Sequence, residues 1–306
     1  MRDIVVVGSL NVDICVQADH IPQPGETVRA GGLGIGPGGK GLNQALAARR
    51  LGARVHMVGR VGEDRFAEVP ERALQQAGVD ASYVRRVSDH HTGTALVVVD
   101  ASSGENAIVV AGGANHQLLP RDVRDAVAAF RASGVLMVQL ELELETVEAA
   151  LDLARENALV TLLDPAPVLQ LSDTLLRKVD ILTPNASEAE RLTEIRVRDP
   201  ESAAEAGSRL QERTGGNVLV TLGAAGCIWV WPTGFEHVSA PRVDALDTTG
   251  AGDAFNAGLA VGLARGESIA RALRQAVRAG AAATQRSGAA SAMPTPEQLD
   301  ALPDGS

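Results

Sequence analysis

"VLMVQLELELETVEAALDLARENALVTLL", at residues 135–163, decides the fold that we expect for this chain. Its two ends, 135–140 and 159–163, are short apolar runs without polar alternation, which is typical of strands buried on both faces. The segment 145–157 between them carries a helical pattern. A strand, a helix and a second strand in this order predict a parallel pair joined by a crossover helix.

The same rhythm runs through most of the chain. It predicts an α/β fold with a mostly parallel central sheet and helices on both faces. Further apolar runs are "IVVVG" (4–8), "VHMVG" (55–59), "VDILT" (179–183) and "VLVTLG" (218–223). Further helices are expected near 40–51, 65–77, 250–265 and 268–284.

Two segments, 14–35 and 92–110, break this rhythm because they resemble strand hairpins without a crossover helix. The second is expected to turn at "SSGEN" (102–106). We interpret the pair as a small β lid over the sheet edge, within a single domain spanning residues 1–306. The tail beyond about residue 295 is expected to fray.

Composition limits the classes of function. A hydrophobic content of 45% supports a full core, built from aliphatic side chains because only 2% of residues are aromatic. A net charge of −10 argues against nucleic-acid or anionic-membrane partners. Cys15 and Cys227 lie far apart and outside any metal-binding spacing, and no apolar run is long enough to span a membrane. We therefore expect a cytoplasmic protein.

The segment "GIGPGGKG" (34–41) matches two phosphate-binding patterns only formally. No strand directly precedes it, as a dinucleotide site requires, and Gly41 stands where a P-loop needs Ser or Thr. We interpret it as a glycine turn entering a helix, with Lys40 and Asn43 near the first turn. Such a site suits a neutral, hydroxyl-rich ligand, and a hinge loop without a ligand remains the alternative.

"GSLNVD" (8–13) follows the first strand. Asn11 and Asp13 are two residues apart, so in an extended chain their side chains face the same way. A carboxylate beside a carboxamide can bind sugar hydroxyls. A polar turn at a strand end is the alternative interpretation.

"DTTGAGDAFNAG" (247–258) precedes a long helical pattern. A helix starting near Gly250 leaves unpaired N–H groups aimed at one point, where its dipole favours an anion. Asp253 in this first turn could be a simple capping acid. The bare glycines favour an anion hole instead, because a phosphoryl group must approach the backbone closely. A carboxylate beside such a hole can accept a hydroxyl proton, which predicts phosphoryl transfer to an alcohol.

These segments together resemble the ribokinase-like (phosphofructokinase-B type) carbohydrate kinase family. "GGKGLNQA" (38–45) is similar to its N-terminal signature and "DTTGAGDAFNAG" to its C-terminal one. "TPNASEAERLT" (183–193) and "TLGAAG" (221–226) match further family elements, so the resemblance runs nearly end to end. The segments "GSLNVD", "PGETV", "TGTALVVVD" and "MVQLELE" are most similar to the members that act on ribose.

The resemblance implies ATP-dependent phosphorylation of the C5 hydroxyl of D-ribose, with Mg²⁺ and K⁺ as cofactors and a homodimer formed through the lid. Asp253 is implied as the general base, beside an anion hole of Gly250, Ala251 and Gly252. The implied sugar-binding residues are Asn11, Asp13, Gly38, Gly39, Lys40, Asn43, Glu141 and Asp253. Those implied for ATP are Asn185, Thr221, Gly223, Gly226, Gly252 and Val277. Those implied for K⁺ are Asp247, Thr249, Ala283, Arg286, Gly288 and Ala292, with Glu188 near Mg²⁺ through water.

Two positions depart from the family pattern. Ala292 stands where a serine is usual, which affects one cation ligand, and Val277 occupies a position that often contacts adenine. The alternatives are a kinase of the same family for another substrate, such as deoxyribose, fructose, 2-keto-3-deoxygluconate or a nucleoside, and a non-catalytic sugar-binding protein. The intact Asp253 and its glycines argue against the non-catalytic alternative, and the scarcity of aromatic residues argues against a nucleoside pocket.

Overall fold

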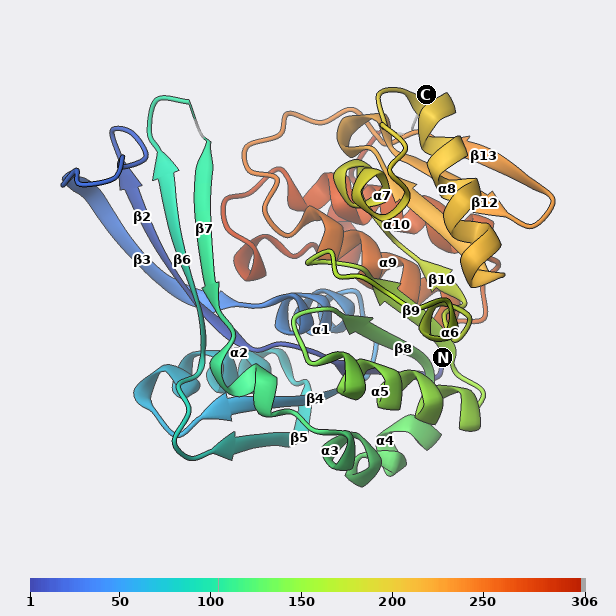
Figure 1. Cartoon of the computed structure of the whole chain (residues 1–306), viewed down its shortest axis with the longest axis horizontal. Coiled ribbons are helices and arrows are strands. Elements are labelled where there is room, and N and C mark those ends of the chain that lie inside the picture. Colours follow the sequence, from blue (N-terminus) through green and yellow to red (C-terminus); the bar gives the residue numbers. More distant parts are fainter. Residues whose placement is uncertain (104, 304–306) are drawn as a thin grey trace.

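The computed structural model describes residues 1–103 and 105–303, and its centre is a nine-stranded sheet (Figure 1). The strand order is β13-β12-β11-β10-β9-β8-β1-β4-β5. Neighbouring strands from β11 to β5 in this order pair in parallel. The strand β12 pairs antiparallel with both of its neighbours, β11 and β13. Their bounds are β1 Asp3–Val7, β4 Val55–Gly62, β5 Asp80–Val87, β8 Ser133–Gln139, β9 Val160–Asp164, β10 Ile181–Leu182, β11 Asn217–Thr221, β12 Cys227–Trp231 and β13 Gly234–Val238.

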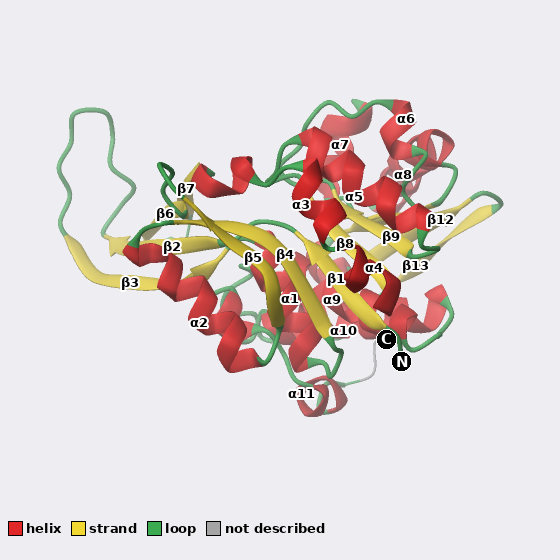
Figure 2. Ribbon diagram, turned by 90° about the horizontal axis from the view of Figure 1, so that it is seen from below, coloured by secondary structure: helices red, strands yellow, loops and turns green. Residues whose placement is uncertain are grey.

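Helices cover both faces of this sheet, as Figure 2 shows. Alternate residues of β1 explain the two layers: Val5 and Val7 pack against one set of helices, and Ile4 and Val6 pack against the other. One layer holds α3 Pro120–Asp125, α4 Val127–Ala132, α5 Leu144–Glu156, α6 Asp173–Leu176, α7 Ala186–Thr193 and α8 Pro200–Thr214. The other holds α1 Lys40–Arg50, α2 Glu68–Ala77, α9 Ala251–Ala264, α10 Ile269–Ala283 and α11 Pro296–Asp300.

A second, four-stranded sheet projects from one end of the molecule (Figure 1). Its order is β3-β2-β6-β7, with β2 Asn11–Ala18, β3 Ala30–Gly38, β6 Gly93–Asp100 and β7 Asn106–Ala111. Two antiparallel hairpins, β2–β3 and β6–β7, join through a parallel β2–β6 contact. Short 3₁₀ turns at 65–67, 113–117, 223–225 and 290–292 complete the structure.

The observed elements correct two expectations. Most of "GIGPGGKG" is strand rather than turn, because β3 runs to Gly38 and pairs with β2, and α1 begins directly at Lys40. The tail forms α11, where Leu299 is buried and its carbonyl accepts a hydrogen bond from Arg278. The expected turn at 102–106 includes residue 104, which lies outside the described residues. Within the described chain no helix combines the length and apolar character needed to cross a membrane.

Candidate active site

The candidate site lies at the carboxyl edge of the parallel strands, where the strand order reverses direction around β1 and β8. Ser9 and Glu141 lie two residues beyond the ends of β1 and β8, and Asp164 is the last residue of β9. Helices α1 and α9 contribute their first turns from the same layer. Segments that are more than 200 residues apart in the chain therefore meet at one place, since Asn43 and Asp253 are 210 positions apart.

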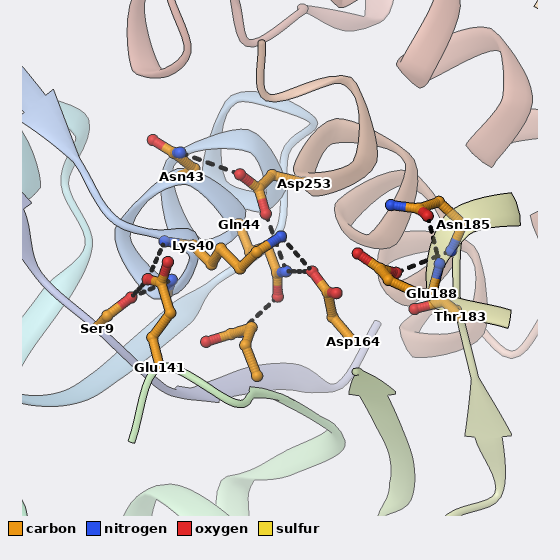
Figure 3. A network of polar contacts seen from close by, with 12 residues as sticks. Ser9, Lys40, Asn43, Gln44, Glu141, Asp164, Thr183, Asn185, Glu188 and Asp253 are labelled. Atoms are coloured by element: carbon orange, nitrogen blue, oxygen red, sulfur yellow. Dashed lines mark hydrogen bonds and ion pairs between the residues drawn. The ribbon is translucent and has the colours of Figure 1, made fainter. Parts of the chain in front are cut away.

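Asp253 is buried in the first turn of α9, and its carboxylate reaches across to α1 (Figure 3). Asn43 Nδ2 donates to its Oδ2 at 3.0 Å, and Gln44 Nε2 donates to its Oδ1 at 3.1 Å. Burial raises the pKa of Asp253 to about 7, although Lys40 acts in the opposite direction. Such a carboxyl can exchange a proton near neutral pH.

Lys40 carries the positive charge of the site. Its Nζ lies 3.2 Å from Asp164 Oδ2, and its backbone N–H donates to Glu141 Oε2 at 3.1 Å. Burial acts to lower the pKa of Lys40, but Asp164, Asp253 and Glu141 together raise it above its usual range. The ammonium group therefore stays charged and sits among carboxylates.

The predicted sugar-binding residues come together around the start of α1. A Cβ at position 38 would lie 2.0 Å from Asp13 Oδ1, so a side chain there would displace the Asp13 carboxylate. Gly39 has φ +92°, and a Cβ on it would lie 2.9 Å from Asn11 N. Asn11 Oδ1 accepts a hydrogen bond from Asn115 Nδ2 at 2.7 Å. Burial, followed by the nearby Glu141, raises the pKa of Asp13 to about 6.

The N-terminus of α9 offers free backbone donors. Within the described chain, the N–H groups of Gly250, Gly252 and Asp253 have no hydrogen-bond partner. Ala251 N–H instead donates to the Thr248 carbonyl at 3.2 Å. Gly250 adopts a left-handed φ of +77°, which turns the chain into the helix, and a Cβ on Gly252 would meet open space. This is the geometry of an anion hole.

A cavity of about 450 Å³ lies beside this helix end and is lined mainly by apolar groups and glycines. It contains five of the six residues predicted for ATP, namely Thr221, Gly223, Gly226, Gly252 and Val277. The sixth, Asn185, pairs with Thr221 by an isolated bridge.

Asn185 and Glu188 form a reciprocal cap on α7. Asn185 Oδ1 accepts from Glu188 N–H at 2.9 Å, and Glu188 Oε2 accepts from Asn185 N–H at 2.8 Å. Burial raises the pKa of Glu188, although the Asn185 N–H acts to lower it. Both residues stand at the carboxyl end of β10, so they face the same edge as Asp164 (Figure 3).

Asp247 joins the two loops predicted for K⁺. Its Oδ1 accepts from Thr249 N–H at 2.9 Å, and its Oδ2 accepts from Gly288 N–H at 2.8 Å. Arg286 N–H contacts the Ala283 carbonyl at 3.4 Å, and Ala292 is buried. Residues 1–103 and 105–303 contain no cluster of three or more His, Cys, Asp or Glu side chains suited to a metal. A cation here would depend on one carboxylate and backbone carbonyls.

Several site residues escaped the sequence analysis, and all are buried polar groups. Asp164 follows the apolar run 159–163 directly, so the sequence could have predicted that it lies at the carboxyl end of a strand. Gln139 interrupts the apolar run 135–140, and Gln44 adjoins Asn43 within the N-terminal signature. The others are Ser9, which donates to Glu141, and Asn115.

The fold and this site define a class of phosphoryl-transferring carbohydrate kinases. The family model described as "pfkB family carbohydrate kinase" matches residues 1–296, so the chain belongs to that family. A ribokinase of Haemophilus influenzae is 39% identical over 298 residues, covering 97% of each chain. A deoxyribokinase of Salmonella typhi is 36% identical over 299 residues with the same coverage.

Among solved structures, the Arabidopsis thaliana ribokinase complexed with ribose and ATP matches with a TM-score of 0.89. It is 33% identical and the match covers 97% of each chain. These similarities confirm the predicted fold class, and they confirm that the protein is an enzyme of the carbohydrate kinase class.

Proposed function

We propose that the protein transfers the γ-phosphoryl group of ATP to the C5 hydroxyl of D-ribose, giving D-ribose 5-phosphate and ADP in the cytoplasm. One observation carries the proposal: the Asp253 carboxylate lies beside unpaired N–H groups, between the polar side chains at the start of α1 and the cavity lined by Gly252. Two similarities support it, to the ribokinase of Haemophilus influenzae and to the solved ribokinase complexed with ribose and ATP.

The sugar is held by groups that match its hydroxyls. Asp13 and Glu141 accept hydrogen bonds, Lys40 donates, and Asn11 and Asn43 can do both. Asn43 Oδ1 is buried and has no partner within the described chain, so it is available for a ligand hydroxyl. Gly38 and Gly39 leave room for Asp13 and Asn11, which are proposed to bind the sugar, to pack against the start of α1.

Asp253 removes the proton of the attacking hydroxyl. A raised pKa suits this role, since a base with a pKa near the working pH combines availability with proton affinity. Free amides at the N-terminus of α9 then stabilise the negative charge on the transferring phosphoryl oxygens. The Lys40 ammonium, close to Asp164, adds a fixed positive charge.

Two cations fit the residues present. Mg²⁺ would neutralise charge on the triphosphate, with Glu188 holding it through water, and the half-buried Glu188 carboxylate at this edge suits a hard cation. K⁺ would lie near Asp247 with Thr249 and carbonyls of Ala283, Arg286, Gly288 and Ala292, and would support the anion hole. Burial acts to raise the pKa of Asp247, but its hydrogen bonds from Thr249 and Gly288 lower it, so the carboxylate stays charged.

The small sheet is proposed as a lid on a single kinase domain, closing over the sugar and excluding water. Its strands β2, β3 and β6 line a cavity of about 1200 Å³ that also contains Asp13 and Asp247. Its other face is proposed to meet the lid of a second copy in a homodimer.

ADP release from ATP with a panel of sugars tests the function. We expect turnover with D-ribose, and deoxyribose is the main competing substrate, because a deoxyribokinase is 36% identical to this chain. Asp253→Asn should lower kcat by about 10²–10⁴-fold with ribose binding retained. Wild-type kcat in this variant would exclude Asp253 as the base, and ribose binding without turnover of any sugar would favour a sugar-binding protein.

The cation proposal has its own test. We expect dialysed enzyme to be much more active in K⁺ than in Na⁺ at equal ionic strength, because K⁺ suits a site of one carboxylate and several carbonyls. Asp247→Asn should remove most of this difference. Equal rates in both salts would contradict the K⁺ site.

A further inference from the structure

Gln44 connects the two acids at the centre of the site. It is fully buried on α1, and its Nε2 donates to Asp253 Oδ1 and to Asp164 Oδ2, each at 3.1 Å (Figure 3). A carboxamide has two N–H donors, so both are used on carboxylates. The side chain therefore bridges α9 and the end of β9.

A second buried amide fixes the orientation of the first. Gln139 Nε2 donates to Gln44 Oε1 at 2.5 Å. If the Gln44 amide were reversed, its oxygen would face two carboxylates and its nitrogen would face the nitrogen of Gln139. Gly8 provides the space for Gln139, since a Cβ on Gly8 would lie 2.2 Å from Gln139 Oε1. The Gln139 amide contacts neither carboxylate.

The charges around Asp253 show why this bridge matters. Lys40 on α1 favours its ionised form, whereas Asp164, at the end of β9, opposes it. Glu141 and Glu188 raise the pKa of Lys40 and are not among the charges that shift the pKa of Asp253. Neutral donors come from Asn43 and Gln44. Gln44 is the one donor of these that binds both acids, so it offsets their mutual repulsion.

We propose that Gln44 is a positioning residue that holds the Asp253 carboxylate in its ionised form and in line with the attacking hydroxyl, with Gln139 fixing the Gln44 amide. The inference rests on the proposed role of Asp253 as the base. It adds two residues to the reaction that touch neither sugar nor nucleotide.

The test is the pH profile of kcat for near-isosteric variants. Gln44→Met keeps the shape of the side chain but removes both N–H donors. The acid limb, which is the fall of kcat at low pH, should then have its midpoint about one pH unit higher. The variant should also lower kcat at pH 7 about tenfold, because fewer molecules carry the ionised base. Gln44→Glu should shift the limb further, since it adds a third negative charge. Gln139→Met should shift it less and in the same direction.

Gln275→Met is the matched control. Gln275 Nε2 donates to the Gly258 carbonyl on the same helix α9 at 2.9 Å, so this variant also removes a side-chain amide that holds α9. It should lower the melting temperature without moving the acid limb. If Gln44 had only a structural role, Gln44→Met would likewise lower the melting temperature and leave the acid limb unmoved.

The outcomes separate this inference from the proposed function. If Asp253→Asn loses activity but the acid limb of kcat is unmoved in folded Gln44→Met, the inference is overturned. The proposed function then remains intact. If Gln44→Met does not fold, the same criterion applies to Gln139→Met. Retained kcat in Asp253→Asn removes the base itself, and the inference falls with it.

Discussion

At the residue scale, two carboxyls of the site should titrate separately in the kinetics. Asp253 has a pKa raised to about 7, so the ionised fraction and kcat should fall about tenfold per pH unit below 7. Asp13 has a pKa raised to about 6, and its protonation removes an acceptor for sugar hydroxyls. The KM for ribose should therefore rise below pH 6, where kcat has already declined. Initial rates between pH 5 and 9 measure both.

Asp13→Asn provides the control for this assignment. An amide cannot titrate here, so KM should be raised at every pH and should no longer depend on pH below 6. The acid limb of kcat should stay near 7. A wild-type KM that is constant from pH 5 to 8 would contradict the role of Asp13.

The sequence predicts single residues well where a local pattern carries the chemistry. Asn43 contacts Asp253 and Lys40 contacts Asp164, because both sit in a short segment at a helix start. The sequence did not predict that Gln44 would donate a hydrogen bond to Asp253, or that Gln139 would donate one to Gln44. Those contacts depend on which strands become neighbours, and local spacing does not contain that information.

At the element scale, the N-terminus of α9 can be tested through Gly252. A methyl group there would meet open space in the free protein, and alanine favours a helix more than glycine by up to about 1 kcal/mol. Gly252→Ala should therefore fold at least as well as wild type. Its kcat should fall by about 10²-fold, because the methyl group occupies space that the phosphoryl group needs. Thermal melting and kcat together measure this.

Gly41→Ala is the contrasting variant, because the space beside this glycine, at the start of α1, is filled by other backbone atoms. A Cβ on Gly41 would lie 2.6 Å from the Gly8 carbonyl carbon and from Ser9 N, which are rigid backbone atoms. It should lower the free energy of unfolding by about 1–3 kcal/mol. An unchanged kcat in Gly252→Ala would mean that the phosphoryl group lies elsewhere.

Elements with a strong hydrophobic periodicity in the sequence were predictable, and elements that depend on pairing with a neighbouring strand were not. The helix expected at 145–157 is observed as Leu144–Glu156, and that at 268–284 as Ile269–Ala283. In contrast, the edge strands β5 and β13 were missed, because their half-exposed residues lack the continuous apolar runs of central strands. The strand β12 was also missed, although its sequence CIWVW is a continuous apolar run. The glycines of β3 resembled a turn because the pairing with β2 that makes them a strand is not visible locally.

At the scale of the whole molecule, an apolar stripe crosses the small sheet. Ile14 pairs with Ile35 on one side and with Leu96 on the other, and Leu96 pairs with Val109. Leu96 is 51% exposed and Val109 is 66% exposed. Cys15 and Val97, which alternate with stripe residues, line the cavity, whereas Ile14, Leu96 and Val109 do not, so these three lie on the opposite face. An exposed apolar row of this kind on a sheet is typical of a protein interface.

We predict that this stripe is where the two copies of the proposed homodimer meet. The double variant Leu96→Glu and Val109→Glu places charge at its centre, so sedimentation at micromolar concentration should change from dimer to monomer. The control is Phe235→Glu, which alters a residue 58% exposed on β13, in the other sheet. It should leave the sedimentation unchanged. A wild-type chain that sediments as a monomer, or a double variant that remains a dimer, would contradict this interface, because burying two added carboxylates against a facing copy of the same stripe would be strongly unfavourable.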